Sequence, residues 1–473
     1  MTTYEAIIGL EVHAQLKTAS KMFCGCATSF GNPPNSNICP VCMAHPGTLP
    51  TVNKRAIEMA IKAGLAVGSN IQEKSIFARK NYFYPDLSKG YQISQYEFPL
   101  CLGGAIALST KTVSIIRIHL EEDAGKLTHD LGHPDKSHVD FNRCGAPLIE
   151  IVSGPDMRTP EEAGEYLRKL RTLLVYLDVC EGNMQEGNLR CDANVSIRPL
   201  GEEKFGTRTE MKNLNSFRAV ERSIAHEIGR QTQMIQEGKK IIQETRLWDE
   251  QAGVTKPMRG KEEAHDYRYF PDPDLLPLIV EKSWIENVRS TLPELPDAKQ
   301  KRFVTDYGIP EYDAEVLTAE KELAHYYEAC IAVHASPKMI SNWMMTELLR
   351  ELKNENISIT KCKITPEQLA TLVKLIDEGT ISGKIAKDVF AEMYRSGKDP
   401  TKIIEEKGLK LVSDTGELES IIERVLANNT KQVEQYRSGK TAVFGFLVGQ
   451  VMKETKGQAN PNVVNDLLKR KLA

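Results

Sequence analysis

Acidic residues concentrate in one stretch of the sequence, residues 117–126, where Glu121, Glu122 and Asp123 follow one another. The residues before them alternate between apolar and polar, as in a strand with one buried face. We expect one face to carry Ile116, Ile118 and Leu120, and the other to carry Arg117, His119 and Glu121. Carboxylates beside imidazole and basic groups suit a divalent cation and a phosphate, whereas a solvated turn would carry the same acids without such a role.

A second candidate lies near the N-terminus, where residues 8–16 also alternate. Glu11 and His13 are two positions apart, so a strand would project both side chains from the same face. A carboxylate and an imidazole placed in this way can bind one metal ion or relay one proton. An ordinary half-exposed strand has the same pattern, so this segment alone leaves both interpretations open.

Four cysteines form two short pairs, Cys24 with Cys26 and Cys39 with Cys42, separated by a loop rich in Gly, Pro and Asn. Four thiolates can close a tetrahedron around zinc and so hold a loop that has no helix or strand of its own. We therefore predict a zinc site here in preference to unligated thiols. Because all four ligand positions are filled by sulfur, the zinc would be structural and not catalytic.

Three further acids and their neighbours lie in strand-like segments. Glu150 stands among aliphatic residues in the run 139–152, where an unpaired carboxylate is costly. The runs 190–198 and 207–213 alternate cleanly, and their polar faces include Arg190 and Asp192 in the first and Arg208, Glu210 and Lys212 in the second. Charge pairs across an antiparallel sheet would give similar rows without an active site.

Two segments combine aromatic with basic residues. In residues 79–95, Lys80 could hold the phosphates of a nucleotide while Tyr82 stacks on its base, although a loop anchored by its aromatic residues is an equal alternative. In residues 266–274, Asp272 and Asp274 stand in a proline frame that could close the site or cap a domain.

The elements that must position these residues change along the chain. Helical spacing of apolar residues appears in 53–67, 160–177 and 220–236, between the strand-like segments. A proline-rich run over 271–296 marks the expected end of the first domain, and from about residue 297 helical patterns dominate, in 316–333, 340–353, 366–378 and 383–393. We predict an α+β catalytic domain over 1–293, a helical domain over 294–407 and a helical tail domain over 408–473.

Composition and charge limit the classes of protein to which the chain can belong. Hydrophobic residues make up 41% and charged residues 26%, as in ordinary globular proteins, and no apolar run approaches the ~20 residues of a membrane span. The start has no basic and apolar leader, so we expect a cytoplasmic protein with reduced thiols.

The tail of the chain is basic. From residue 421 onward the net charge is +5, against −8 for the rest, which suits a polyanionic partner. Gly439-Lys-Thr441 is not a Walker motif, because Glu434 stands where that motif requires glycine.

Several long motifs together resemble the B-subunit family of bacterial tRNA-dependent amidotransferases, over essentially the whole chain. They are residues 9–13, 80–95, 119–126, 190–194, 266–271 and the tail 439–461. The resemblance implies an antiparallel β cradle similar to that of glutamine synthetase. It also implies a heterotrimer with an amidase A subunit and a small C subunit, acting on misacylated tRNA. The B subunit would use ATP and Mg²⁺ to phosphorylate the side-chain carboxylate of Glu-tRNA(Gln) or Asp-tRNA(Asn), and ammonia from the A subunit would then displace the phosphate.

The resemblance also assigns residues. It implies Glu11, His13 and Glu122 as magnesium ligands, with Glu121, Glu150, Asp192 and Glu210 as further acids around the metal. Alternation favours Glu121 and the resemblance favours Glu122, and we follow the second, because a strand end can turn that residue inward. Lys80, Arg190, Arg208 and Lys212 are the expected phosphate-binding residues. The cysteine pairs occur in only some members of this family, so the zinc prediction rests on their spacing.

Two other classes of protein remain as alternatives. A non-catalytic, zinc-containing tRNA-binding protein would share the cysteines and the basic tail but would not turn over ATP. A metal-dependent hydrolase built on His13 and the acids would act without ATP or tRNA.

Overall fold

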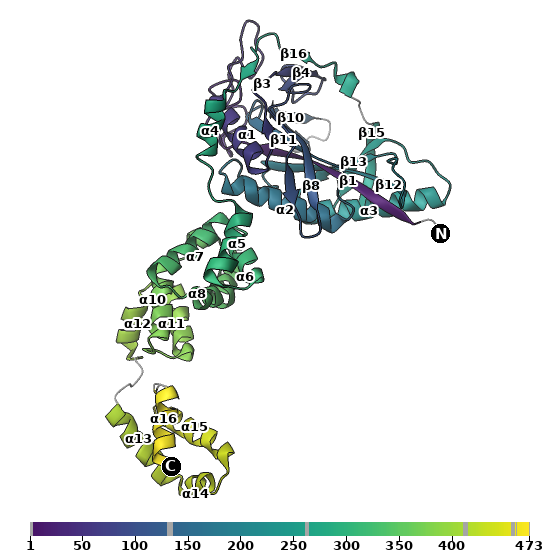
Figure 1. Cartoon of the computed structure of the whole chain (residues 1–473). Coiled ribbons are helices and arrows are strands. Elements are labelled where there is room, and N and C mark those ends of the chain that lie inside the picture. Colours follow the sequence, from purple (N-terminus) through teal and green to yellow (C-terminus); the bar gives the residue numbers. More distant parts are fainter. Residues whose placement is uncertain are drawn as a thin grey trace. The chain divides into compact units, whose positions relative to one another are not determined.

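The computed structural model describes residues 3–129, 136–260, 264–409, 415–455, 459 and 461–472. The chain divides into two compact units, residues 1–296 and 297–473 (Figure 1). The division falls close to the predicted domain end at residue 293, within the run where prolines interrupt regular structure.

The first unit is built on one large sheet. Among the described residues, ten strands belong to it, and their order along the sheet is β15, β14, β13, β12, β1, β11, β8, β6 and β2, with β7 paired to β8. Their bounds in that order are Val254–Gly260, Glu244–Asp249, Thr209–Leu214, Leu189–Pro199, Tyr4–Gln15, Pro147–Ser153, Thr112–Glu122, Cys101–Leu102 and Asn70–Ile71, with Ala105–Ala107 for β7. The longest strands, β1, β8 and β12, carry predicted site residues, as does β11 between β1 and β8.

The sheet is mixed, which differs from the antiparallel cradle expected from the sequence. β13 and β14 pair in parallel, with Glu210 opposite Thr245, while the other strand pairs recorded in this sheet are antiparallel. The long helix that intervenes between β13 and β14 explains the difference, since a crossover connection returns the chain in the same direction.

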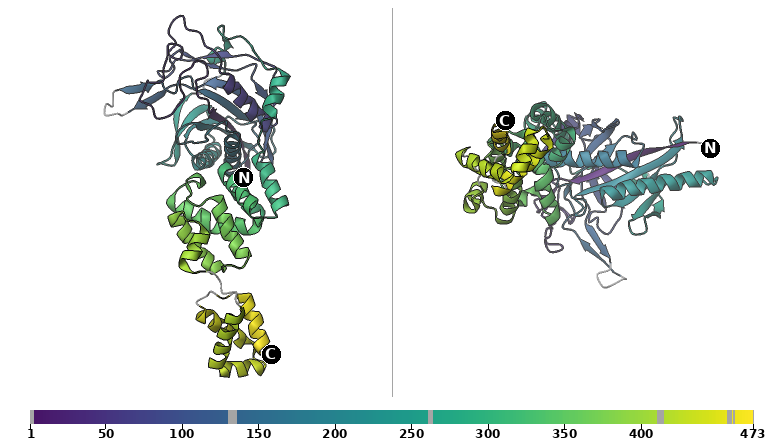
Figure 2. Two further views of the ribbon diagram at one scale, coloured as in Figure 1. Left: turned by 90° about the vertical axis from the view of Figure 1, so that its left-hand side faces the viewer. Right: turned by 90° about the horizontal axis from the view of Figure 1, so that it is seen from below.

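Helices cover one face of this sheet. α2 (Pro160–Tyr176) and α3 (Phe217–Gln236) contact β1 and β12 and lie along the lower side of the sheet in Figure 1, and Figure 2 gives two further views of them. Thr159 accepts a hydrogen bond from the Glu162 backbone N–H at 3.1 Å and so acts as the N-cap of α2. The buried side chains of β1, β12 and α2 belong to one hydrophobic core. The opposite face of the sheet is therefore left for polar residues.

β8 departs from the predicted alternation at one position. Ile118 and Leu120 are buried as expected, but Ile116 is 52% exposed. The pairing with β11 explains this, because Val152 lies opposite Arg117 whereas Ser153 lies opposite Ile115, so β8 has one extra residue there. Such a β-bulge reverses the faces of the residues that precede it.

Smaller elements complete the first unit. Helices α1 (Lys54–Ala66), α4 (Lys282–Arg289) and the 3₁₀ turn η1 (Ala264–Tyr267) accompany three small sheets. One sheet joins β9 (Lys126–His129) to β10 (Ser137–Asp140), and another joins β17 (Leu278–Ile279) to β3 (Lys74–Ser75). The third places β4 (Ala78–Asn81) between β5 (Tyr91–Ser94) and β16 (Phe270–Pro271), so that the two aromatic and basic segments of the sequence become neighbours.

The second unit is helical throughout its described residues. One hydrophobic core gathers α5 (Pro296–Tyr307), α6 (Glu311–Thr318), α7 (Lys321–Val333), α8 (Pro337–Trp343), η2 (Met344–Leu348), α9 (Leu349–Glu355), η3 (Ile359–Lys361), α10 (Pro366–Asp377), α11 (Gly383–Ser396) and α12 (Pro400–Lys407). The segment 316–333 is not one helix as predicted, because α6 ends at Thr318 and Glu320 adopts an extended conformation before α7. The run 340–353 likewise contains a π-helical turn, η2.

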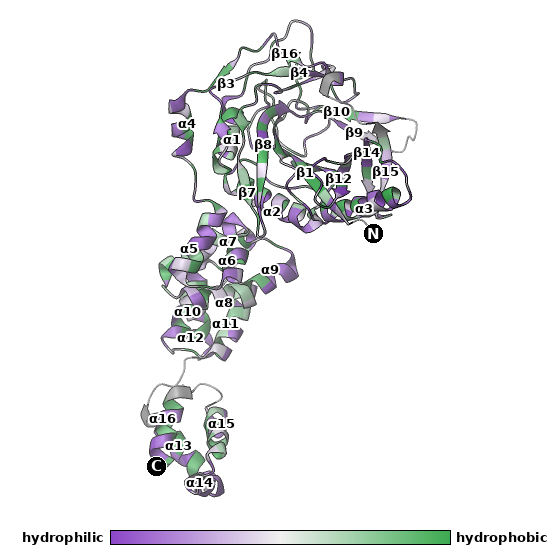
Figure 3. Ribbon diagram, turned by 45° about the vertical axis from the view of Figure 1, so that its right-hand side comes forward, coloured by the Kyte–Doolittle hydropathy of each residue, from purple (hydrophilic) through white to green (hydrophobic). Residues whose placement is uncertain are grey.

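A separate hydrophobic core gathers the last α-helices, α13 (Thr415–Asn428), α14 (Thr430–Arg437), α15 (Phe444–Glu454) and α16 (Pro461–Leu472), and the short 3₁₀ turn η4 (Thr441–Val443) precedes α15. Figure 3 shows that these helices carry both hydrophilic and hydrophobic residues, as expected of helices with one packed side. The predicted boundary at residues 407 and 408 lies next to residues 410–414, which are outside the described residues. No helix in the described part of the chain has the length and apolar character needed to cross a membrane.

Candidate active site

Four site residues lie side by side across neighbouring strands of the large sheet. In the register of the sheet, Arg190 lies opposite His13, His13 opposite Glu150, and Glu150 opposite His119. Residues opposite each other in an antiparallel pair have Cβ atoms about 5 Å apart, so the four side chains must interact. Strand pairing thus assembles this row from β12, β1, β11 and β8.

The side chains in this row converge on two carboxylates. Nε2 of His13 lies 3.5 Å from Oε1 of Glu121 and 3.4 Å from Oε2 of Glu150. Nε2 of His119 lies 3.4 Å from the same oxygen of Glu150 and 3.9 Å from Oε2 of Glu121. One donor atom each of His13, Glu121 and Glu150 lies within 4.8 Å of the other two, so a single ion could contact all three. Carboxylate oxygens with one imidazole nitrogen are a suitable donor set for a divalent cation.

The electrostatics of this group favour an added positive charge. Burial alone would lower the pKa of His13, but a hydrogen bond to Glu150 and the charges of Glu150 and Glu121 raise that pKa to about 9. Burial would raise the pKa of Glu150, but His119 and His13 hold it well below its ordinary value. Glu150 therefore stays ionised, and either a proton on His13 or a metal ion balances its charge.

His119 faces the two carboxylates through one ring nitrogen. Its side chain is buried and its Nε2 atom approaches Glu150 and Glu121, while its Nδ1 atom has no hydrogen-bond partner among the described residues. Because the two nitrogens point to different sides of the imidazole ring, the unpaired Nδ1 indicates a water or polar group behind the ring and not an ion between the carboxylates.

Two basic side chains border the group. Burial would lower the pKa of Lys80, but interactions with Tyr269, Glu121 and Glu150 raise it, so the lysine stays charged close to both carboxylates. Nη2 of Arg190 lies 3.0 Å from Oδ1 of the buried Asp123, which fixes the guanidinium beside His13. Both residues were predicted as phosphate ligands, and the structure places both beside the cluster.

A second acidic group lies next to the first on the same face of the sheet. Glu11, two residues from His13 along β1, lies opposite Asp192 and accepts a hydrogen bond from Nδ2 of Asn194 at 2.9 Å. The ammonium of Lys212 pairs with Asp192 and lies 3.5 Å from Oε1 of Glu210. Asp192 and Glu210 thus share one lysine, and Glu11 lies beside this pair, opposite Asp192 in the sheet.

The structure separates Glu122 from His13, which differs from the ligand set implied by the resemblance. Oε1 of Glu122 accepts a hydrogen bond from the Ile93 backbone N–H at 3.0 Å and pairs with Lys89. Glu122 lines a cavity of about 230 Å³ together with Lys89, Tyr91 and Cys42. Because β8 runs through residue 122, successive side chains alternate in direction, and Glu121 is the one that joins His13.

Two further predicted residues occupy different environments. Arg208 stands just before β13 and is exposed, so it is not among the residues grouped around His13 or Lys212. The ring of Tyr82 lies 6.0 Å from the ammonium of Lys80, so it is close to the cluster.

Sequence reasoning left two neighbours of the site out of its ligand sets, namely His119 and Asp123, and treated Lys89, like Lys80, as a residue that could hold phosphates. His119 lies on the expected polar face of its strand, and a fuller use of that alternation would have added it. Asp123 and Lys89 act as ion-pair partners over long sequence separations, for which the sequence carries no local signal.

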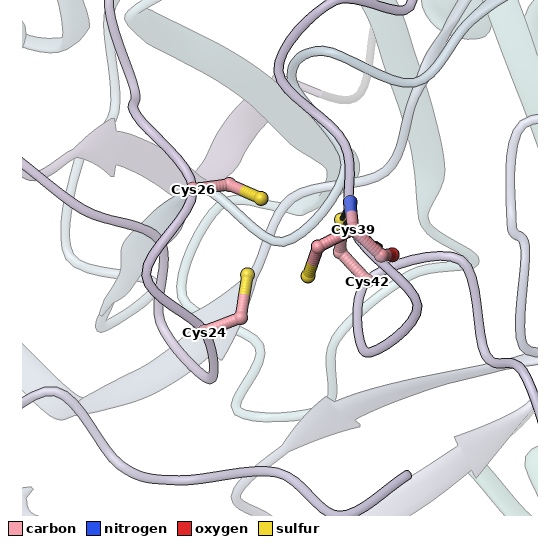
Figure 4. Close-up of side chains that lie close together, drawn as sticks. All are labelled: Cys24, Cys26, Cys39 and Cys42. Atoms are coloured by element: carbon pink, nitrogen blue, oxygen red, sulfur yellow. Dashed lines mark hydrogen bonds between the residues drawn. The ribbon is translucent and has the colours of Figure 1, made fainter.

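The four predicted zinc ligands lie together. Figure 4 shows Cys24, Cys26, Cys39 and Cys42 with their sulfur atoms turned toward one another, and these atoms lie within 4.8 Å of each other. The Cys39 backbone N–H donates to Sγ of Cys42 at 3.2 Å. A hydrogen bond from Cys24 and the nearby Lys21 ammonium lower the pKa of Cys42 to about 4, while burial raises that of Cys26 to about 11. Four sulfur atoms at this spacing fit one tetrahedral zinc ion.

Lys21 supports this assignment. Its side chain is fully buried, and its Nζ atom donates to the Asn37 carbonyl at 2.7 Å and to Sγ of Cys42 at 3.6 Å. A buried ammonium is stable only beside negative charge, and a zinc ion held by four thiolates carries a net charge of −2. The residues present therefore fit a zinc ion.

Comparison with known proteins identifies relatives of both units. Residues 6–286 match the family model described as the GatB/GatE catalytic domain, and residues 325–472 match the one described as the GatB domain. The chain is 59% identical to a protein of Geotalea daltonii and to one of Geotalea uraniireducens, and 57% identical to one of Geobacter sulfurreducens. Each comparison covers 99% of both chains, and each relative is named as the B subunit of an aspartyl/glutamyl-tRNA(Asn/Gln) amidotransferase.

Proposed function

The chain belongs to the family of B subunits of aspartyl/glutamyl-tRNA(Asn/Gln) amidotransferases, and on this basis we propose that the His13 face of its large sheet uses ATP to activate a carboxylate. It is a subunit of a glutamine-dependent ligase. The observation that carries the proposal is the grouping of His13, Glu121 and Glu150 on one sheet face, beside the charged Lys80.

The proposed reaction has two steps. A side-chain carboxylate oxygen of Glu-tRNA(Gln) or Asp-tRNA(Asn) attacks the γ-phosphorus of ATP, and the bond to the β-phosphate breaks to release ADP. Ammonia then attacks the carbonyl carbon of the resulting acyl phosphate, the C–O bond to phosphate breaks, and inorganic phosphate leaves with the amide formed. The first step brings two anions together, so it needs fixed positive charge at the site.

Different residues of the chain would bind the metal ion and supply the positive charge. His13, Glu121 and Glu150 would hold a magnesium ion, which when bound neutralises charge on the phosphates. Lys80 and Arg190 supply permanent positive charge on either side of that group. Asp192 and Glu210 hold Lys212 at the neighbouring position, where its ammonium could contact a second phosphate group. A cradle similar to that of glutamine synthetase would expose this face to both ATP and the tRNA end.

The zinc site has a structural role in this proposal. Cys24, Cys26, Cys39 and Cys42 would hold the ion, which pins a loop that otherwise has little regular structure. The cavity that Glu122 and Lys89 line has Cys24 and Cys42 in its wall, so the ion would also fix one side of that cavity.

The partners follow from the family and from the charge of the tail. We propose a cytoplasmic heterotrimer in which an amidase A subunit supplies ammonia and a small C subunit joins the assembly. The basic tail domain would contact the tRNA backbone, with Lys469, Arg470 and Lys471 in the last turn of α16 as candidate phosphate contacts. A purely tRNA-binding protein would have no use for a buried group of acids around His13, so this group argues against the non-catalytic alternative.

The experiment that tests the proposal is ATP hydrolysis by the reconstituted heterotrimer, with and without glutamyl-tRNA carrying the glutamine anticodon. We expect the charged tRNA to stimulate phosphate release and Glu150→Gln to abolish the stimulation. Uncharged tRNA and Arg208→Met, which changes an exposed residue, are the matched controls. A rate that responds neither to charged tRNA nor to Glu150→Gln would refute the proposed function.

A further inference from the structure

A continuous row of tyrosines lies beside Lys80. The ring centroids of Tyr82 and Tyr267 are 6.1 Å apart, those of Tyr267 and Tyr269 are 6.2 Å apart, and both pairs meet edge to face. Tyr269 stacks on Tyr96 with the rings 4.4 Å apart and nearly parallel. These geometries are the favourable ones for aromatic pairs, so the four rings stabilise one another.

The segment that carries Tyr267 and Tyr269 is fixed in place by β4. Phe270 and Pro271 of β16 pair with Arg79 and Ala78, and Nδ2 of Asn81 donates to the carbonyl oxygens of Tyr267 at 3.2 Å and Arg268 at 2.8 Å. Arg268 has a φ of 45°, a left-handed conformation that is uncommon outside glycine. Strained backbone of this kind persists only where its surroundings enforce it, and it often marks a functional turn.

Lys80 lies against this row. Its ammonium is 4.8 Å from the ring centroid of Tyr267 and 6.0 Å from that of Tyr82, within the range of a cation–π interaction. Lys80 also lies opposite Gln92 in the pairing of β4 with β5. From β5, Nε2 of Gln92 donates to the carbonyl oxygen of Glu122 at 2.7 Å, and the Ser94 hydroxyl donates to Oε2 of Glu121 at 3.5 Å. Lys80 therefore lies against an aromatic wall, on the strand pair that contacts the carboxylate end of β8.

We propose that Tyr267 is a positioning residue that holds the Lys80 ammonium away from Glu121 and Glu150 and available to the phosphates of ATP. The inference rests on the proposed function. A lysine side chain is flexible, and beside two carboxylates it would otherwise form direct ion pairs with them. Such pairs would neutralise the oxygens that the metal needs. The face of an aromatic ring attracts the ammonium without consuming a carboxylate, so both the metal ligands and the lysine charge stay available.

Tyr82, Tyr269 and Tyr96 support Tyr267 in this role. Tyr82 and Tyr269 pack against Tyr267 from two sides, and Tyr96 stacks on Tyr269. The row joins the loop after β4, the segment before β16 and the second residue after β5, so it links the two aromatic and basic segments of the sequence.

The test is equilibrium binding of Mg·ATP to the reconstituted heterotrimer, measured by calorimetry. We expect Tyr267→Leu to weaken binding about tenfold, because it removes the aromatic face, and Tyr267→Phe to bind as the wild type does, because it keeps that face. In a Lys80→Met background, Tyr267→Leu should cause no further loss, since Tyr267 acts through the lysine. The matched control is Phe205→Leu, which removes an exposed ring that lies 5.5 Å from the Arg198 guanidinium, another cation–π pair.

Equal affinity for the wild type and Tyr267→Leu would overturn the inference, and so would an additive loss in the double variant or a loss in Tyr267→Phe equal to that in Tyr267→Leu. A wild-type complex that binds Mg·ATP but shows no tRNA-stimulated hydrolysis would instead refute the proposed function, and the affinities of the variants would still decide the role of Tyr267. A wild-type complex that binds no ATP would overturn both.

Discussion

Glu150 lies directly opposite His13 in the register of β11 and β1, and the two side chains approach to 3.4 Å. His119 approaches the same carboxylate oxygen from the other side, also at 3.4 Å. One carboxylate therefore joins two histidines from two different strands. Glu121 contacts both histidines as well, so the group behaves as a single charged unit and the loss of any member should affect the others.

The position of Glu150 predicts its effect on metal binding. We expect Glu150→Gln to weaken binding of Mn²⁺, a spectroscopic substitute for Mg²⁺, by more than about 100-fold, since even the partners of metal ligands are worth 10–100-fold. Glu122→Gln should leave the affinity unchanged, because Glu122 pairs with Lys89 and not with His13. Electron paramagnetic resonance of free Mn²⁺ measures both. An equal loss in the two variants would contradict the placement of Glu121 and Glu150 as the ligands.

Lys212 and Arg208 give a matched pair of basic residues in one strand region. We expect Lys212→Met to lower kcat/KM for ATP by more than about tenfold, because Asp192 and Glu210 hold its half-buried ammonium in place. Arg208→Met should change it by less than about twofold, because the residue is exposed. Steady-state kinetics of tRNA-dependent ATP hydrolysis provide the comparison. A larger loss of kcat/KM in Arg208→Met than in Lys212→Met would contradict the role of Lys212 in the use of ATP.

Zinc content tests the cysteine cluster separately from catalysis. We expect one zinc ion per chain by elemental analysis after magnesium is chelated, and none in Cys39→Ser. Cys39→Ser should also lower the midpoint of thermal unfolding, because the loop loses its cross-link. Cys330→Ser, which changes a buried cysteine of the helical unit, is the control that should keep the zinc. Zinc retained in Cys39→Ser would contradict the four-sulfur site.

Glu227 predicts a pH dependence of stability away from the candidate active site. Burial would raise its pKa, but hydrogen bonds from Arg230 and Gln231 lower it, so the folded state favours the ionised form. The stabilisation is therefore present above the ordinary glutamate pKa of about 4.3 and is lost as the pH falls through the lower value of the folded state.

Replacement of this residue tests that expectation. We expect Glu227→Gln to reduce the free energy of unfolding by about 2 kcal/mol at pH 7, since it removes one of the two carboxylates, with Glu244, that pair with Arg230 and Arg246. The difference from the wild type should shrink below pH 4. Urea unfolding of both proteins at the two pH values gives the result, and a difference independent of pH would contradict it.

Local patterns were sufficient to predict the strands that carry the site. Alternation in β1 and β12 correctly predicted that Glu11 and His13, and Arg190 and Asp192, project from polar faces, because a strand with one packed face must alternate. Alternation also favoured Glu121, while the resemblance favoured Glu122, and the geometry agrees with alternation. The grouping of the four cysteines could be predicted for a similar reason, since the short spacing within each pair limits where the thiols can lie.

Long-range features could not be read in the same way. The extra residue at Ile116 depends on how β8 pairs with β11, a strand formed more than 30 residues later in the chain. The pairing of Lys89 with Glu122 depends on folding one loop against the end of β8, and the parallel pairing of β13 with β14 depends on the path of α3 between them. Each is decided by tertiary packing, which a periodic pattern within one segment does not encode.

The proposed function makes a specific demand on His13. If this face of the sheet activates the side-chain carboxylate of the charged tRNA, His13 must be a ligand of the metal ion that accompanies ATP. The most direct measurement is electron spin echo envelope modulation of Mn²⁺ bound with ATP in the heterotrimer, because it detects a nitrogen nucleus bonded to the metal. We expect a directly bonded imidazole nitrogen in the wild type and in His119→Ala, and its loss in His13→Ala. A spectrum without such a nitrogen, or one unchanged in His13→Ala, would contradict the proposed site.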